Sequence, residues 1–106
     1  MPKYMISANY TARGMEGVRA AGAKSRVDAV SAMLEAMGGR LESFHFAFGD
    51  PDVFAVADVP DDEAAAAVAM AINSTGAVSV RTTKLLAPEQ IDEALSRSVD
   101  YRAPGS

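Results

Sequence analysis

The sequence predicts an α+β fold: one four-stranded antiparallel sheet with helices packed on one of its faces. Two observations support this prediction. Residues 40 to 59 contain two alternating runs joined at Gly49-Asp50-Pro51-Asp52, the pattern of a β-hairpin. On each side of the hairpin, the chain has another alternating run and a segment with helical periodicity. The resulting order, β-α-β-β-α-β with a helix at the end, is the split βαβ or ferredoxin-like arrangement.

The first strand and the first helical region precede the hairpin. Residues 3 to 10 alternate, with Tyr4, Ile6, Ala8 and Tyr10 on one side and Lys3, Met5, Ser7 and Asn9 on the other. Thr11 is suited to cap a helix, but the glycines that follow lower helix propensity, so we expect a helix in pieces with a break near Gly22. Spacings of three and four then predict an amphipathic helix through Val27, Val30, Met33, Leu34 and Met37, ended by Gly38-Gly39.

The hairpin is expected to pair strands at 40–48 and 53–59. In the first strand, Phe44, Phe46 and Phe48 share one face, and Leu41, Ser43, His45 and Ala47 share the other. In the second strand, we expect Phe54 and Val56 on the bulky face and Val53, Ala55 and Ala57 on the small one.

Another helix, a strand and a short helix follow the hairpin. An acidic first turn suits the positive end of a helix dipole, and this alanine-rich helix is predicted to reach about Asn73 with Val68, Ala71 and Ile72 buried. The last strand begins at Gly76 and places Val78, Val80 and Thr82 on one face. Pro88 opens the final helix, because proline in a first turn loses no hydrogen bond. We therefore expect one domain over residues 1–97 and a polar tail over 98–106.

Composition excludes several classes of protein. The chain has 106 residues, 49% of them apolar, which is the size and character of one globular domain. Ten basic residues against fourteen acidic ones give a net charge of -4 without a basic stripe, so nucleic acid is not an expected partner. The absence of cysteine removes disulfides and thiolate chemistry. With no secretory leader and no run of about 18 apolar residues, we expect a soluble cytoplasmic protein and no membrane partner.

The sheet face away from the helices requires a partner. Its residues are too apolar for open water and too polar for a closed core: Met5, Ser7, Asn9, Leu41, Ser43, His45, Val53, Ala55, Ala57, Ala77, Ser79, Arg81 and Thr83. A second copy stacked on this face would bury it and leave a cavity between the two sheets. We therefore predict a homodimer with an α+β barrel interior. A β-bulge would invert these assignments along part of a strand.

The chain resembles the GYD domain family in MPKYMISANYTARG, in GGRLESFHFAFGDPDVFAVADVPDD, and in AINSTGAVSVRTTKLLAPEQIDEAL with VDYRAPG. The resemblance covers essentially the whole chain. The Gly-Tyr-Asp motif that names the family falls in the hairpin, where this chain has Gly49, Asp50, Pro51 and Asp52, with Pro51 in place of the tyrosine. The resemblance implies a dimeric α+β barrel, akin to monooxygenases, isomerases, dehydratases and effector-binding domains. It implies no particular activity.

His45 and Asp52 are the candidate catalytic residues. His45 is the one histidine, the residue type that changes charge near neutral pH, and parity places it on the cavity face. Asp52 is a candidate to orient it, since a carboxylate bonded to an imidazole fixes the imidazole tautomer. The alternatives are a histidine that fills space at an interface and an aspartate that serves only the turn.

Ligand contacts are expected from small and polar residues of the cavity face, namely Ser7, Asn9, Ser43, His45, Ala55, Ser79 and Arg81. Arg81 offers paired donors to a carboxylate, although an ion pair between subunits would use it equally well. No metal site and no cofactor are expected, because one histidine and no cysteine leave carboxylates to complete any site. The glycine-rich segment 11–22, with Lys24 and Arg26 after it, lacks the spacing of a phosphate loop and suits a lid or a weak helix.

Three functions from different classes remain open. The first is a module that binds an apolar or aromatic small molecule in the dimer cavity. The second is a cofactor-independent oxygenase or isomerase in which His45 transfers a proton. The third is a structural or assembly protein whose sheet face is only an interface.

Overall fold

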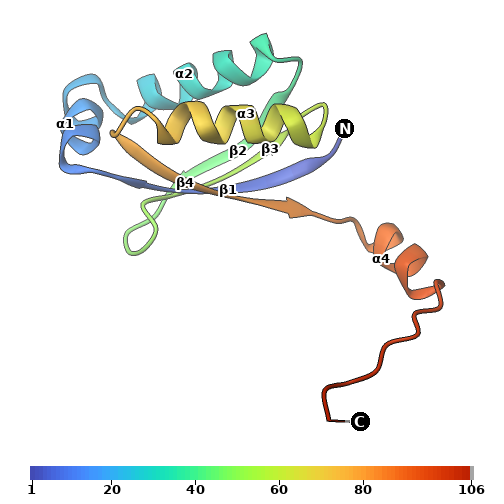
Figure 1. Cartoon of the computed structure of the whole chain (residues 1–106). Coiled ribbons are helices and arrows are strands. Elements are labelled where there is room, and N and C mark those ends of the chain that lie inside the picture. Colours follow the sequence, from blue (N-terminus) through green and yellow to red (C-terminus); the bar gives the residue numbers. More distant parts are fainter. Residues whose placement is uncertain (106) are drawn as a thin grey trace.

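The computed structural model describes residues 1–105 and contains one antiparallel sheet with a layer of helices on one side (Figure 1). The elements are β1 (Lys3–Tyr10), α1 (Ala12–Ala21), α2 (Ala23–Ala36), β2 (Arg40–Phe46), β3 (Val53–Asp58), α3 (Asp62–Asn73), β4 (Val78–Leu85) and α4 (Pro88–Leu95). The strand order is β2-β3-β1-β4, so β1 and β3 are central while β2 and β4 form the edges. The predicted α+β class, with four antiparallel strands in one sheet, is confirmed.

The helical region before the hairpin is divided at Gly22, as its glycines predict. Thr11 caps α1, and its hydroxyl accepts a hydrogen bond from the backbone N–H of Gly14 at 3.2 Å. Gly22 has a φ of 93°, a conformation that residues with a side chain rarely adopt, and α2 begins at the next residue. Gly38, with a φ of 81°, follows the end of α2.

Two buried clusters hold α2 and α3 against the sheet. The first contains Tyr4, Leu34, Ala57, Val59 and Ala65, and the second contains Ala8, Val53, Ala55 and Val80. Alanine recurs on both the strands and α3, so the helix backbone lies close to the sheet. Ala71, which was expected to be buried, is instead exposed on α3.

The structure corrects the faces predicted for β3. Val53, Ala55 and Ala57 are buried beneath the helices, with 2%, 3% and 0% of their surface exposed. Phe54 and Val56 therefore lie on the opposite, open face, because successive side chains of a strand alternate. The prediction assigned the bulky residues of β3 to the helix side, but the helices pack over Val53, Ala55 and Ala57 of this strand instead.

A β-bulge in β2 accounts for a second correction. The pairing of β2 with β3 shifts between Leu41 and Ser43, so Leu41 pairs with Ala57 and faces the helices while Ser43 pairs with Val56. Leu41 was expected on the open face. The strand also ends at Phe46, and Phe48 lies in the following loop with 99% of its surface exposed.

The C-terminal part of the chain leaves the sheet. Beyond β4, α4 and the residues after it extend past the end of the sheet, away from the helix layer (Figure 1). No residue of α4 is buried, and its Leu95 has 77% of its surface exposed. The radius of gyration is 17.0 Å, against about 13 Å for a compact chain of this length. This segment therefore gains little from the rest of its own chain.

Within residues 1–105, no helix combines the length and the apolar character that crossing a membrane requires.

Candidate functional site

Four side chains form one row across the open face of the sheet. His45 of β2 pairs with Phe54 of β3, Phe54 pairs with Ser7 of β1, and Ser7 pairs with Arg81 of β4. Paired residues of an antiparallel sheet point to the same face, so the row crosses all four strands. Three of the predicted ligand contacts are thus brought together, and Phe54, with 41% of its surface exposed, lies between two of them.

The neighbouring rows hold the other predicted contacts that lie on this face. Ser43 pairs with Val56, which pairs with Met5, and Met5 pairs with Thr83. On the other side of the row, Asn9 pairs with Ser79. The open face is therefore a mixture of apolar and small polar side chains, as expected from the sequence. From β3, however, it carries Phe54 and Val56 and not the expected Ala55 and Ala57.

Ala55 and Asp52 lie elsewhere. Ala55 packs among buried residues on the helix side, so the expectation that it lines the open face is wrong. The Oδ2 atom of Asp52 accepts a hydrogen bond from the backbone N–H of Tyr10 at 2.9 Å, and the Asp52 N–H donates to the carbonyl of Ala8 at 2.9 Å. Asp52 thus fixes the loop, and within residues 1–105 it makes no hydrogen bond to His45.

A charged cluster closes the far end of the open face. Asp58 is 8% exposed and forms ion pairs with Lys3 at 3.0 Å and with Arg40 at 3.2 Å. The hydrogen bonds from Lys3 and then from Arg40 lower the pKa of Asp58 below its ordinary value, against the opposing effect of burial. Lys3 also pairs with Glu42, so two cations and two carboxylates neutralise one another at this end of the face.

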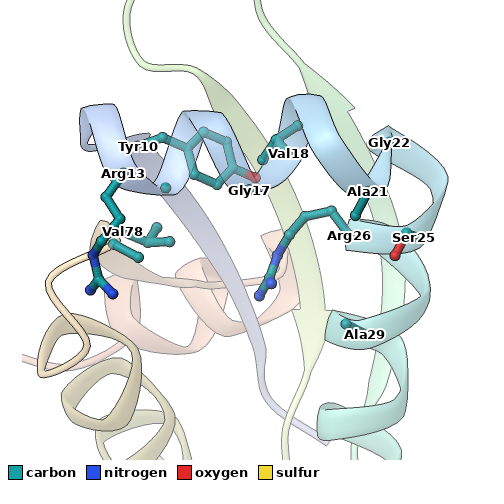
Figure 2. A pocket seen from close by; sticks show the side chains of 12 residues that line it. Tyr10, Arg13, Gly17, Val18, Ala21, Gly22, Ser25, Arg26, Ala29 and Val78 are labelled. Carbon is teal, nitrogen blue, oxygen red and sulfur yellow. The ribbon is translucent and has the colours of Figure 1, made fainter.

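A pocket of about 270 Å³ lies on the other side of the sheet, beneath α1 and the start of α2 (Figure 2). Its lining comes from the two helices, the end of β1 and the start of β4 with the residue before it, and many of the residues are small. They are Tyr10, Arg13, Gly14, Gly17, Val18, Ala21, Gly22, Ser25, Arg26, Ala29, Ala77 and Val78. The turn at Gly22 brings the two helices together over this space. In Figure 2 the ring of Tyr10 lies between the side chains of Arg13 and Arg26.

Two arginines and a tyrosine provide the polar atoms of this pocket. Arg13 donates from Nη2 to the carbonyl of Thr75, whereas the half-buried Arg26 has no ion pair or side-chain hydrogen bond with any residue from 1 to 105. Burial raises the pKa of the Tyr10 phenol, against the lowering effect of Arg26. The phenol is therefore protonated at neutral pH and is a hydrogen-bond donor.

The pocket continues into a narrower, apolar slot between α2 and the sheet. This slot, of about 40 Å³, shares Tyr10, Arg26 and Val78 with the pocket. Its remaining lining is entirely apolar and consists of Ile6, Ala8, Val30, Met33, Phe44, Val53, Ala55, Ile72 and Val80. The two spaces together have a charged mouth and an apolar interior.

The family model of the GYD domain matches residues 4–95 of the 106-residue chain. The chain belongs to the GYD domain family. The match runs from β1 to the last residue of α4, so this GYD domain includes both the open face and the pocket. No match was found among the curated proteins or among the solved structures.

The pocket of this GYD domain was not predicted from the sequence. The glycines of residues 11–22 and the nearby Lys24 and Arg26 lack the spacing of a phosphate loop and predict a lid or a weak helix, and neither prediction places a pocket beneath them. A usable signal was available: a helix break at Gly22 places an arginine in the first turn of α2 next to the end of β1. In the part of the chain that the structure describes, no three His, Cys, Asp or Glu side chains are placed to hold a metal ion.

Proposed function

We propose that this GYD domain forms a homodimer in which the two open sheet faces stack, as in a ferredoxin-like dimeric α+β barrel, and that a small molecule binds between the sheets. The observation that carries this proposal is the row formed by His45, Phe54, Ser7 and Arg81 across all four strands. An aromatic ring next to a histidine, with an arginine two strands away in the same row, is a surface suited to an apolar or aromatic ligand with a polar group.

The apolar part of the open face supports the dimer. Phe54 is exposed in the single chain, and Met5 and Val56 are only half-buried. A second sheet stacked on this face would cover all three side chains. Four strands about 4.8 Å apart and about seven residues long at about 3.3 Å each span roughly 20 by 23 Å. That footprint is of the order of half the roughly 800 Å² per partner of a standard interface.

The helix α4 offers the remaining contact area. It lies outside the body of its own chain and exposes Ile91 and Leu95, while Leu86 is exposed in the link that precedes it. A helix with an exposed apolar side and no residue buried by its own chain is suited to a partner. In the proposed dimer, each α4 packs against the other subunit beside the stacked sheets.

Small side chains support a cavity between the stacked faces. Facing sheets lie about 10 Å apart when large side chains fill the gap. Ser7, Ser43 and Ser79 are too small to fill it, so space remains next to Phe54. His45 and Arg81 would provide the polar contacts of a ligand held there.

Sedimentation equilibrium of the wild type and two matched variants tests the dimer. Phe54→Glu places a charge in the middle of the open face, and Phe48→Glu places the same charge in the exposed loop outside it. We expect the wild type and Phe48→Glu to be dimers and Phe54→Glu to be a monomer that retains its circular dichroism spectrum. A monomeric wild type, or a Phe54→Glu variant that dimerises normally, would refute the stacked arrangement.

The His45→Ala variant then separates the three candidate functions. If the sheets enclose a ligand, an aromatic fragment soaked into crystals of the dimer occupies the space beside Phe54, and His45→Ala weakens its binding without breaking the dimer. Lost turnover with retained binding would instead identify an enzyme. A weakened dimer with no effect on any ligand would identify an assembly protein.

A further inference from the structure

The pocket beneath α1 and α2 is a binding site separate from the stacked faces. We propose that it binds a small organic carboxylate with an apolar body, the carboxylate on the guanidinium of Arg26 and the apolar body directed into the slot behind it. The strand residues that line the pocket, Tyr10 and Val78, point to the helix side of the sheet. The site is therefore complete within one subunit and does not depend on the proposed dimer.

The pocket is maintained by backbone geometry. A Cβ atom placed on Gly14 would lie 2.0 Å from the carbonyl oxygen of Ala77, so α1 contacts the start of β4 directly at this glycine. A Cβ atom on Gly17 would meet nothing within 4 Å. One turn of α1 is thus anchored on the sheet, while the adjoining turn leaves its inner side open. The space of the pocket therefore results from the way α1 packs on the sheet.

The charge of the lining favours an anion. Arg13 and Arg26 are its two charged residues, and none of its twelve residues is acidic, although the chain as a whole has a net charge of -4. Three of the seven arginines form ion pairs with carboxylates: Arg19 pairs with Glu16, Arg40 with Asp58 and Arg97 with Glu93. A half-buried guanidinium without a partner among residues 1–105 is therefore an available anchor for a negatively charged group.

The size and polarity of the space identify the rest of the ligand. A volume of about 270 Å³ with a slot of about 40 Å³ behind it lies near the lower end of the range for small-molecule sites. Tyr10 and Arg26 have the only polar side chains among the residues that line the slot. A ligand with one singly charged group and a compact alkyl or aryl body fits both the charged mouth of the pocket and the apolar slot. A phosphate ester would bring a second charge that the apolar lining cannot solvate.

Tyr10 adds a hydrogen-bond donor beside Arg26. Its ring is half-buried in the lining, and its phenol is protonated at neutral pH. A carboxylate held by Arg26 could accept a second hydrogen bond from this hydroxyl. Tyr10 and Arg26 together would favour a carboxylate over an amide of the same shape, because an amide nitrogen carries hydrogens and accepts no bond.

Titration of matched acid and amide pairs into the isotope-labelled full-length chain, followed by NMR, tests the site. The probes are phenylacetate with phenylacetamide and hexanoate with hexanamide, each at the same concentrations, with inorganic phosphate as a further ligand. We expect the acids to shift the backbone amides of Gly17, Val18 and Ala29 and to bind at least about tenfold more tightly than the amides.

Five variants assign the binding to this pocket. Arg26→Met should abolish the preference for the acids, and Arg26→Lys should retain part of it. Gly17→Phe should block both acids and amides by filling the pocket, whereas Ala20→Phe, on the exposed side of the same helix, should leave binding unchanged. Arg19→Met, at an exposed position of the same helix outside the pocket, should also bind normally.

Several results would overturn the inference. Acids and amides that bind equally, or a chain that binds neither acid, would do so. So would an Arg26→Met variant that keeps the preference for acids, or an Arg19→Met variant that loses it. Phosphate that binds more tightly than either acid would also contradict the proposal. The stacked dimer can fail independently, because the monomeric Phe54→Glu variant should bind the acids as the wild type does.

Discussion

The backbone N–H of Tyr10 donates a hydrogen bond to Oδ2 of Asp52 at 2.9 Å, so the end of β1 is tied to the loop that leads into β3. Asp52 makes two further bonds through its backbone, donating to the carbonyl of Ala8 at 2.9 Å and accepting from the N–H of Ala47 at 2.7 Å. The loop that carries Asp52 therefore helps to position Tyr10, whose ring lines the pocket on the helix side.

Replacing Asp52 by alanine should destabilise the fold. The variant leaves the half-buried Tyr10 N–H without its acceptor, which should lower the free energy of unfolding by about 1 to 2 kcal/mol. Chemical denaturation measures this change. Asp50→Ala is the control, since Asp50 is exposed in the same loop and makes no side-chain hydrogen bond within the described residues; its effect should stay within about 0.5 kcal/mol. Equal losses in both variants would contradict the role assigned to Asp52.

Two glycines of α1 should respond to alanine in opposite directions. Gly14→Ala forces a methyl group against the Ala77 carbonyl and should cost about 1 to 3 kcal/mol of unfolding free energy. Gly17→Ala meets no neighbouring atom and should stabilise the helix by up to about 1 kcal/mol. Thermal and chemical unfolding of the pair measure both changes. A neutral Gly14→Ala variant would show that α1 does not rest on β4 as described.

Asp58 should make stability depend on pH in the acid range. The hydrogen bond from Lys3 and the weaker effect of the one from Arg40 lower the pKa of Asp58 in the folded state, so the unfolded chain binds the proton more readily. Its stabilisation is therefore present above the ordinary carboxyl pKa of about 4 and is lost as the pH falls through the lower folded value. Unfolding free energies of wild type and Asp58→Asn, measured from neutral pH downwards, should differ at neutral pH and converge in acid.

The control for Asp58→Asn is Asp28→Asn on the surface of α2. Asp28 pairs with Lys24 at 3.0 Å, but both side chains are largely exposed, so this change should have little effect at any pH. The interpretation fails if the two variants show the same pH dependence.

Removal of residues 88–106 should weaken the dimer and leave the body of the domain intact. No residue of α4 is buried, so in the monomeric Phe54→Glu background the truncation should change the unfolding free energy by less than about 0.5 kcal/mol. In the wild-type background, the dissociation constant should rise at least about tenfold, which sedimentation equilibrium can measure. A large loss of stability in the monomer would mean that α4 folds back onto its own chain.

Local sequence patterns predicted the elements of the fold well. The alternation in residues 3 to 10, the glycines around α1 and α2, and the acidic turn before α3 each depend on neighbours close in the chain, and the structure confirms the elements they predicted. The same patterns did not predict which face of β3 is buried. Alternation shows that Val53 and Phe54 point to opposite sides, but it does not show which side the helices cover.

The candidate sites could be predicted only in part from the sequence, because they depend on the tertiary structure. The sequence identified His45, Ser7 and Arg81 as residues of one face, and the register places them in one row with Phe54. It did not identify the pocket, because Tyr10, Arg26 and Val78 come from three elements that meet only after the helices have docked.

By itself, the sequence determined the helices, the strands and their order, because hydrophobic periodicity, caps and glycines act over a few residues. Only the tertiary structure decided that the bulge after Leu41 and the close approach of α2 and α3 put Ala55 inside and Phe54 outside. Register and helix docking depend on contacts between residues far apart in the chain, and those contacts leave no local pattern.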